Sequence, residues 1–363
     1  MRTPQPMAAP LNTPVVLWLH RRPGLTGQVF SAIREARPRR LFLIADGPKP
    51  GQEADCAAAR AVVDAVDWEC RVERNFSETN LGIRERIVSG INWVFEQVEE
   101  AILLEDDTLC HPGFFGYCQE LLERYRDQPE VQMICGTNPL GAWESSGDYF
   151  FSRYGAIWGW ATWRRAWKTY DSALARYREL DVEALFHRHL KVEGQADHAF
   201  WRFRLLSGSR FDTWDLQWLL GCALQGGYCA VPTRNLVRNI GFGGQATHTV
   251  NVRDPRSLPL FSLPSALTHP PSEPPALVDE KFERWSYWMH LLSRLEQTPQ
   301  LRLWSVALSR NPDLRVPTPS DSEAKFYLEP LRHPEELREL LLHLEQVAPE
   351  NDGVIHLKEA IGL

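Results

Sequence analysis

The sequence contains no C-x-x-C pair, and its seven cysteines are an odd number scattered between positions 56 and 229. This argues against a zinc ribbon and against a disulfide framework, and it favours a reducing compartment. No apolar run approaches the roughly 20 residues that a membrane helix needs. Residues 1–14 are proline-rich and polar, unlike a signal peptide. We therefore expect a cytoplasmic protein without a transmembrane segment.

An excess of positive charge is also absent. Forty basic residues face 47 acidic ones, which gives a net charge of -7 and an isoelectric point near 5.9. A general nucleic-acid binder or a binder of anionic membranes is not expected from this balance. With 44% hydrophobic and 24% charged residues, the 363-residue chain has the composition of an ordinary globular protein of one large or about two domains.

Short apolar runs alternate with segments of helical spacing through the first 135 residues. This alternation predicts an α/β fold with a largely parallel sheet and helices on both faces. The runs predict strands over 15–19, 41–45, 71–73, 101–104 and 133–135, and the periodic segments predict helices around 30–36 and over 52–66, 83–98 and 112–126.

The second half of the chain divides differently. Residues 253–277 are rich in proline and serine and indicate a linker or an extended wrapping segment. Apolar periodicity predicts two further helices, over 278–296 and 334–347. We expect a flexible N-terminus (1–13), a main domain (14–252) and a helical C-terminal extension (278–363) whose apolar face packs back on the domain or forms a homodimer.

Polar residues follow several predicted strands directly. Arg21 and Arg22 follow the first strand, Asp46 the second, and Glu105, Asp106 and Asp107 the run over 101–104. In open α/β sheets, ligands bind beyond the carboxyl ends of the strands. We therefore expect these side chains to share one edge of the sheet.

The three consecutive carboxylates suggest a metal site. Charge so close to a buried strand is costly unless a cation or hydrogen bonds compensate it. Mg²⁺ and Mn²⁺ bind through one or two carboxylates together with substrate phosphates, and they neutralise a departing diphosphate. The alternative is an acidic loop at a helix start with solvated carboxylates.

Weaker signals have equally plain alternatives. Asp46 either forms a turn with Gly47 or accepts a hydrogen bond from a nucleotide base. The segment Asn80–Gly82 reads as a turn, and Arg84 and Arg86 stand at a helix start, which is a natural anion site, although exposed helical arginines are common. Arginines 21 and 22 either contact phosphate oxygens or are surface charges.

Two aromatic patterns occur between residues 158 and 167. Trp160, Trp163 and Trp167 follow the spacing i, i+3 and i+7, which predicts core packing. Trp158 lies off this stripe in a glycine-flanked turn, where its ring could stack on a sugar.

Three strings together support a resemblance. The chain resembles a bacterial family labelled hemolysin-associated, or HlpA-like, in these segments: Asn80–Gly82, Ile102–Phe115 (with Glu-Asp-Asp and Pro-x-Phe-Phe) and Phe151–Trp167 (with Trp-Gly-Trp-Ala-Thr-Trp). Its members are nucleotide-sugar glycosyltransferases of the GT-A fold. More remotely, residues 14–250 resemble eukaryotic N-acetylglucosaminyltransferases that act on mannose, in which Glu-Asp-Asp, Gly-Trp and Trp-Asp recur in this order.

The resemblance implies roles for matching residues. Asp46 would hold the base, uracil, while Glu105 would touch the ribose, Asp106 the donor sugar and Asp107 the metal ion. Where the family has Asp-Arg after the first strand, this chain has His20–Arg22, which leaves open which arginine meets phosphate. Further residues expected at the nucleotide or donor are Asn80, Gly82, Arg86 and Trp158; Trp158 replaces an aliphatic residue of the relatives and leaves the donor sugar open.

The candidate general base is Asp215. It matches the Trp-Asp of the eukaryotic relatives, and inverting transfer needs a carboxylate that takes a proton from the acceptor hydroxyl. The alternative is that Asp215 caps the apolar helix that begins there. Asp212 is the second candidate base.

A glycine-rich segment over 239–249 predicts a lid that orders when nucleotide binds. We expect Thr247, His248 or Thr249 near the diphosphate. Thr247 is the candidate donor contact and His248 a candidate second metal ligand, although a histidine in such a loop is more often not a ligand.

Together these features predict a metal-dependent glycosyltransferase that uses Mn²⁺ or Mg²⁺. It would move a sugar from a nucleotide sugar, expected to be a UDP-sugar, to a hydroxyl of a glycan or related acceptor, with inversion. One alternative is a sugar-phosphate nucleotidyltransferase, but only Gly24 and Gly27 follow the first strand and no G-x-G-x-x-G pattern is present. The other is a carbohydrate-binding or secreted toxin module, for which no secretion signal is apparent.

Overall fold

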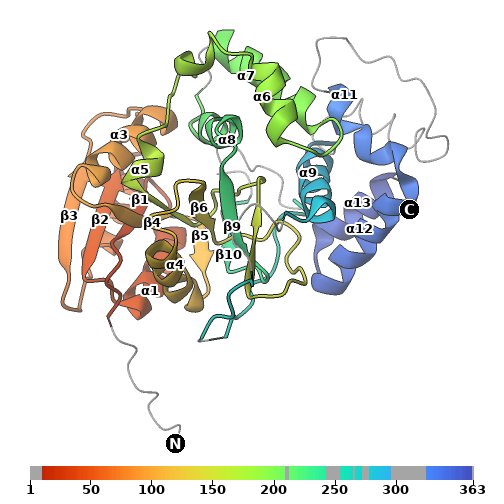
Figure 1. The fold of residues 1–363 in the computed structure, drawn as a ribbon. Helices are drawn as coiled ribbons and strands as arrows, with labels where there is room; N and C mark the ends of the chain where they lie inside the picture. Colours follow the sequence, from red (N-terminus) through yellow and green to blue (C-terminus); the bar gives the residue numbers. More distant parts are fainter. Residues whose placement is uncertain are drawn as a thin grey trace, which may run out of the picture.

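The computed structural model describes residues 10–208, 212–242, 254–264, 266–271, 278–295 and 324–361. An eight-stranded sheet forms its centre, in the order β3-β2-β1-β4-β8-β6-β9-β7 (Figure 1). The pairs β1·β2, β1·β4, β2·β3 and β6·β9 are parallel, whereas β8 and β7 run antiparallel to their neighbours. The predicted α/β fold class is confirmed.

The strands of this sheet are β1 (Val15–Leu19), β2 (Arg40–Ala45), β3 (Arg71–Phe76), β4 (Glu100–Glu105), β6 (Val131–Cys135), β7 (Tyr149–Ser152), β8 (Trp160–Trp163) and β9 (Tyr228–Pro232).

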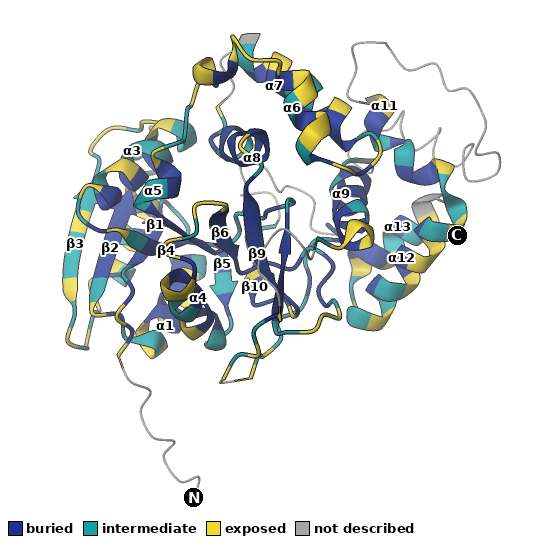
Figure 2. Ribbon diagram, viewed as in Figure 1, coloured by how far each residue is buried: buried dark blue, intermediate teal, exposed yellow. Residues whose placement is uncertain are grey.

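Strand β1 shows why the sheet is covered on both faces. Every one of its five residues is buried. Val16 and Trp18 belong to one apolar core, and Val15, Leu17 and Leu19 to the other, because successive side chains point to opposite faces. Figure 2 shows the buried sheet between the helical layers. A continuous apolar run of this kind is typical of parallel strands.

Helices fill both sides of the sheet. The face that includes Val15 carries side chains of α1 (Pro23–Ala36), α2 (Glu53–Val62) and α4 (Gly113–Arg124). The other face carries α3 (Ile83–Phe95), part of α8 (Asp215–Leu224) and the C-terminal helices.

Several element ends differ from the predictions. The helix predicted over 52–66 ends at Val62, and the helix predicted over 83–98 ends at Phe95. The short strand expected at 71–73 continues to Phe76 because its pairing with β2 continues to the partners Ala45 and Phe76.

The tryptophan stripe is buried as predicted, but its helical explanation is wrong. Trp160 and Trp163 are the ends of strand β8, and Trp167 ends the short helix α5 (Arg164–Trp167). Because of the strand alternation, Trp160 enters one core and Trp163 the other.

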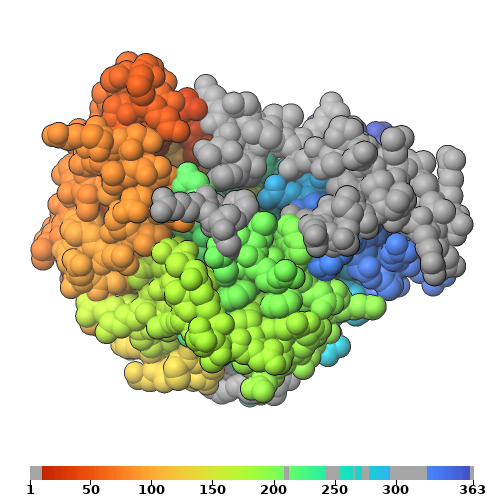
Figure 3. Space-filling model, turned by 90° about the horizontal axis from the view of Figure 1, so that it is seen from above, coloured from red at the N-terminus to blue at the C-terminus, as the bar shows by residue number. Residues whose placement is uncertain are grey.

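A layer of helices lies over one end of the sheet. Helices α6 (Val182–His189) and α7 (Gln195–Gly208) pack with α8 around a third apolar cluster that contains Phe186, Phe203 and Leu220. The 3-10 helix η1 (Ala175–Tyr177) leads into this layer. Seen from above, these green segments lie between the orange N-terminal part and the blue C-terminal helices (Figure 3).

The C-terminal helices pack on the main domain. Helix α9 (Glu280–Leu295) matches the helix predicted over 278–296, and α12 (Pro334–Val347) that over 334–347. Apolar residues of both lie in the same core as Val16 of β1, which places their apolar faces against the domain. The predicted homodimer through these helices stays a prediction. The remaining elements are α11 (Ala324–Tyr327), η2 (Glu329–Arg332) and α13 (Asp352–Ile361).

The described parts of the proline-rich segment run against the domain. The backbone N–H of Phe261 donates to the Asn235 carbonyl at 2.8 Å, and Leu258 is buried. This favours wrapping over a free linker. At the other end, residues 1–9 lie outside the described part, but Leu11 and Thr13 are buried, so the packed domain begins a few residues before the predicted boundary at 14. No helix in the described ranges has the length and apolar character to cross a bilayer.

Candidate functional site

Register aligns the ends of three parallel strands. Trp18 of β1 stands opposite Glu105 of β4, and Leu19 stands opposite Ala45 of β2. The residues that follow these strands therefore emerge at one edge, as predicted.

The acidic residues form a tight turn between β4 and the short strand β5 (Thr108–Cys110). The Thr108 hydroxyl accepts from the Glu105 N–H at 3.0 Å and donates to the Glu105 carbonyl at 2.9 Å. These two hydrogen bonds close the turn, with Asp106 and Asp107 at its tip. Strand β5 pairs antiparallel with β10 (Val237–Asn239), which leads into the glycine-rich segment.

Arg22 bridges the two aspartates of the turn. Its guanidinium forms ion pairs with Asp106 and, at 2.8 Å, with Oδ2 of Asp107. Burial opposes the charge on Arg22, but the two carboxylates outweigh burial and raise its pKa. The backbone N–H of His20 also donates to Asp106, at 3.4 Å. Of the two arginines that follow β1, Arg22 therefore contacts the acidic turn, while the contact of either with phosphate stays a prediction.

The raised pKa of Glu105 indicates that the positive charge of Arg22 alone does not balance the negative charge of this turn. Burial raises the pKa of Glu105 to about 8, and the charges of Asp107, Asp106 and Asp215 act in the same direction, against Arg22. A desolvated cluster of oxygen donors with surplus negative charge suits a hard divalent cation. The donor set therefore fits Mg²⁺ or Mn²⁺.

Asp215 reaches the same edge from helix α8. Its charge acts on Glu105, which places it near the acidic turn. It is the first residue of α8, and its carboxylate accepts a hydrogen bond from the Thr213 hydroxyl. Within the described ranges no backbone N–H of the helix donates to it, so the capping alternative is not observed.

Asp212 contacts the start of helix α3. Its Oδ1 accepts a hydrogen bond from the backbone N–H of Arg84 at 3.3 Å, in the first turn of α3. An exposed aspartate in this position caps a helix N-terminus. Asp212, the second candidate base, is therefore a cap for α3.

Asp46 is tied to the turn that precedes α3. Its Oδ1 accepts from the N–H groups of Gly47 and Leu81, and its Oδ2 accepts from the Asn80 amide and the Gly82 N–H, at 2.9–3.1 Å. Gly82 has φ +83°, a conformation that favours glycine. Asp46, Asn80 and Gly82 are thus brought together, with Asp46 holding the turn. Its contact with a base stays a prediction.

Within the described residues, two of the predicted arginines make no contact with the acidic turn. Arg86 is buried and donates to the side-chain oxygen of Asn75 at 2.9 Å, and burial lowers its pKa. Arg21 makes no hydrogen bond or ion pair with a described residue, and its charge acts on the Cys56 thiol. Their contacts with substrate also stay predictions.

The start of the glycine-rich segment packs directly on the acidic turn. The Ile240 N–H donates to the Asp107 carbonyl at 2.8 Å. A Cβ on Gly241 would collide with Oδ2 of Asp107 and lie 2.8 Å from Nη1 of Arg22. The next residue, Phe242, meets the ring of Trp158 edge-on at 5.8 Å. Residues 243–250, including Thr247, His248 and Thr249, lie outside the described part of the chain.

Sequence reasoning missed four residues that shape this edge. Thr108 and Thr213 position carboxylates, Gly241 leaves room for Asp107, and Arg256 lies 5.3 Å above the Trp158 ring. For Thr108 and Thr213, the available sequence signal is a hydroxyl residue that directly follows an aspartate. Nothing in the sequence places Arg256 beside Trp158.

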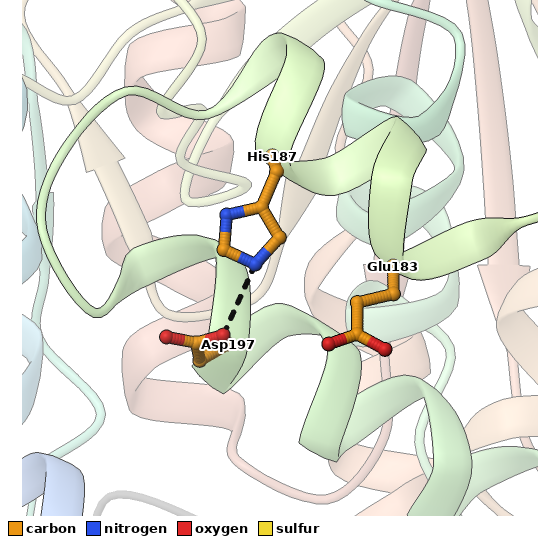
Figure 4. A group of neighbouring side chains, drawn as sticks. All are labelled: Glu183, His187 and Asp197. Carbon is orange, nitrogen blue, oxygen red and sulfur yellow. Dashed lines mark hydrogen bonds and ion pairs between the residues drawn. The ribbon is translucent and has the colours of Figure 1, made fainter.

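Other groups of metal-binding type lie elsewhere. In Figure 4, His187 contacts Asp197 at 3.1 Å with Glu183 beside them, all exposed on α6 and α7. A second such group is Glu193, Glu329 and His333. Exposed acidic groups of this kind are common without an ion, and neither group contains a predicted site residue.

A pocket of about 610 Å³ opens between α3, α5 and the segment that follows α5. Its lining includes Trp167, Tyr170 and Arg176, and none of the predicted site residues. Tyr170 lies close enough to Asp215 for that charge to act on its hydroxyl.

No family model matches the chain. No curated protein matches it either. Among 70 matching chains of solved structures is a mannosyltransferase from Pyrobaculum calidifontis in complex with GDP-Man and Mn²⁺, with 11% identity and a TM-score of 0.32 over 100% of this chain and 80% of that one. Another is a UDP-glucose pyrophosphorylase complexed with UDP-glucose, with 10% identity and a TM-score of 0.33 over 62% of this chain and 92% of that one. Neither similarity assigns a family.

Proposed function

We propose that the protein is a metal-dependent glycosyltransferase of the HlpA-like, GT-A type, which transfers a sugar from a UDP-sugar to a hydroxyl of a glycan or related acceptor with inversion. The observation that carries this proposal is the acidic turn at the carboxyl edge of the sheet. There, Arg22 bridges Asp106 and Asp107, and the charge of Asp215, the first residue of α8, acts on Glu105. Sugar transfer needs a cation site for the diphosphate and a carboxylate that accepts a proton. The acidic turn would supply the first and Asp215 of α8 the second.

In this proposal Asp107 holds the divalent ion, Asp106 contacts the donor sugar and Glu105 the ribose. A bound Mn²⁺ or Mg²⁺ neutralises charge on the departing diphosphate. Arg22 already lies between the two aspartates, so it supplies a second positive charge on the phosphate side.

Asp215 acts as the general base. The Thr213 hydroxyl fixes one of its oxygens, which leaves the other to take the proton of the acceptor hydroxyl as that oxygen attacks the anomeric carbon. Its place on a helix start, rather than on the acidic turn, separates the base from the metal side.

Donor recognition falls to the neighbouring loops. Asp46, which follows β2, accepts hydrogen bonds from the Asn80–Gly82 turn that precedes α3. The nucleotide base would lie beside Asp46. Trp158, whose side chain is partly exposed, would stack on the sugar. Thr247 would contact the diphosphate, with His248 as a further metal ligand. Arg86 would be a further contact of the nucleotide. A cytoplasmic location is part of the proposal.

The decisive experiment is a screen of UDP- and GDP-sugars for Mn²⁺-dependent hydrolysis and for thermal stabilisation of the full chain. We expect a UDP-sugar to respond, and EDTA to abolish the response. Asp107→Asn should remove the metal-dependent part. A response to GDP-sugars alone would contradict the assignment of uracil to Asp46.

Incubation with UTP and a sugar 1-phosphate separates the nucleotidyltransferase alternative. Release of pyrophosphate in that mixture, with no sugar transfer from any nucleotide sugar, would replace the proposed function.

A further inference from the structure

The pocket of about 610 Å³ lies on the side of the sheet that carries α3 and α8. One of its walls belongs to α3, and the other to α5 and the segment over 168–176. Figure 1 shows α3 and α5 beside each other. The volume falls within the range of about 300–1,000 Å³ that is usual for binding sites of small ligands.

The buried part of the pocket lining is aromatic. Phe95 and Trp167 are each only 4% exposed. The ring of Tyr170 lies parallel to that of Trp167, with ring centres 4.3 Å apart and planes inclined by 9°. Nε1 of Trp167 donates to the side-chain oxygen of Asn92 at 2.8 Å, which ties this wall to α3. A fixed aromatic surface of this kind suits the apolar C–H face of a sugar ring.

Hydrogen bonds within the segment over 168–176 hold the second wall in place. The two carboxylate oxygens of Asp171 accept from the N–H groups of Ala173 and Arg176, at 3.0 and 2.9 Å. Nη1 of Arg176 donates to the Thr169 carbonyl at 2.9 Å. The pocket is therefore formed before any ligand binds, which lowers the entropic cost of binding.

The charged side chains of the lining include both hydrogen-bond donors and acceptors. Lys168 and Arg176 donate, whereas Glu96 and Asp171 accept. Arg164, the remaining charged residue of the lining, pairs with a glutamate outside the pocket. An anion would meet two carboxylates here and gains little. A sugar hydroxyl both donates and accepts, which matches this mixed lining.

The aromatic wall continues to the helix that carries Asp215. The ring of Trp167 lies 5.3 Å from the ring of Trp218 in α8. Trp218 is three positions, about 4.5 Å along the helix axis, beyond Asp215. The pocket therefore lies beside the element that would supply the base.

We propose that this pocket binds sugar units of a neutral acceptor chain, next to the unit whose hydroxyl reacts. This inference rests on the proposed function and narrows its acceptor to an uncharged oligosaccharide. None of the predicted site residues lines the pocket, so the reacting unit and the units in the pocket are different parts of one chain. Long acceptors therefore bind more tightly than short ones, because their additional units contact the pocket.

Calorimetry on the full chain compares neutral tetrasaccharides with their monosaccharides. The probes are cellotetraose, maltotetraose, mannotetraose and the tetramer of N-acetylglucosamine, with tetragalacturonic acid as the charged comparison. We expect at least one neutral tetrasaccharide to bind at least about tenfold more tightly than its monosaccharide, because additional hydrogen bonds contribute affinity. The inference is overturned if no neutral tetrasaccharide shows this preference, or if the charged one alone binds.

Variants on the two walls locate the binding. Ser172→Trp fills the pocket from an exposed position and should weaken the tetrasaccharide at least about tenfold. Ala173→Trp is the matched control, because the neighbouring position is also exposed but does not line the pocket. Glu96→Ala removes an acceptor from the α3 wall and should weaken binding about tenfold, and it repeats the test in case Ser172→Trp disturbs the fold. Unchanged binding by both Ser172→Trp and Glu96→Ala, or equal losses in Ser172→Trp and its control, contradicts the inference.

Transfer from the UDP-sugar that responds provides a second readout. Ser172→Trp should raise the KM of the tetrasaccharide acceptor at least about tenfold and leave that of the monosaccharide acceptor unchanged. Equal changes in the two KM values would show that the pocket does not recognise acceptor length.

Titration of UDP with Mn²⁺ distinguishes a failure of this inference from a failure of the proposed function. If the parent binds UDP and no neutral tetrasaccharide, this inference is wrong while the proposed function survives. If the parent binds a tetrasaccharide that Ser172→Trp excludes, but no UDP, the proposed function is wrong and with it the role of the pocket as an acceptor site.

Discussion

Gly241 lies against Asp107 so closely that any side chain at position 241 would occupy the space of the carboxylate. The same residue lies next to Arg22, so the glycine-rich segment, the start of α1 and the acidic turn meet at one point. The start of this segment is therefore part of the site itself.

Gly241→Ala is expected to lower metal-dependent transfer at least about tenfold, because its Cβ forces Asp107 or the segment to move. Steady-state rates at several Mn²⁺ concentrations measure this loss. Gly116→Ala is the control, since a Cβ at this position in α4 meets nothing within 4 Å. Unchanged rates for Gly241→Ala would show that Asp107 needs no such space.

Asp215→Asn is expected to reduce turnover by roughly 100- to 10,000-fold, because the amide cannot take the acceptor proton. The affinity for UDP with Mn²⁺ should stay within about twofold, since the proposed nucleotide contacts lie on other elements. Rapid-quench turnover and equilibrium titration test the two halves. An Asn variant with the parent's rate would remove Asp215 as the base.

Asp212→Ala is expected to behave in the opposite way. It removes the cap on the Arg84 N–H, which should cost about 0.5–1 kcal/mol of unfolding free energy. The rate of transfer at saturating substrate should remain close to the parent's. Denaturant unfolding and kinetics on the same preparation distinguish the cap from a base.

Arg22→Ala leaves Asp106 and Asp107 without their bridging cation. We expect a loss of about 3 kcal/mol of stability in the absence of metal, because a mostly buried charge loses its partner. Mn²⁺ should raise the melting temperature of this variant more than that of the parent. Arg21→Ala is the neighbouring control, and identical Mn²⁺ responses in all three proteins would argue against a cation at the turn.

Glu283 of α9 gives a pH-dependent prediction away from the site. Burial raises its pKa, although the Ser152 hydroxyl and the Arg153 N–H donate to it. Since its folded pKa lies above its unfolded value, the stability contributed by its protonated form is present at low pH and is lost as pH rises through the folded pKa. Glu283→Gln should therefore gain stability relative to the parent as pH rises from the ordinary glutamate pKa, about 4.3, through the raised pKa of Glu283.

The comparison is made by denaturant unfolding at several pH values. Glu350→Gln, at an exposed position between α12 and α13, serves as the control and should track the parent. A difference between Glu283→Gln and the parent that does not change with pH would contradict the prediction.

Sequence patterns predicted the edge of the sheet well. Apolar runs located β1, β2 and β4, and strand parallelism then placed Asp46, Arg22 and the acidic turn together. These inferences depend on local periodicity and on one general rule of sheet geometry, both of which are visible in a single sequence.

Long-range contacts were beyond such reasoning. Asp212 caps a helix that begins 129 positions earlier, and Arg256 reaches Trp158 across nearly a hundred residues. The tryptophans show a further limit, because Trp160 and Trp163 reach the core from a strand although their spacing is helical. Burial was predictable there, while the element that provides it was decided by tertiary pairing.

Asp212 and Asp215 are three positions apart, yet Asp212 accepts a hydrogen bond at the beginning of α3 and the charge of Asp215 acts on Glu105. A short stretch of backbone therefore connects the start of α3 with the residue that we propose as the base. Under the proposed function, a displacement of α3 would reach that carboxylate through only three positions of the chain.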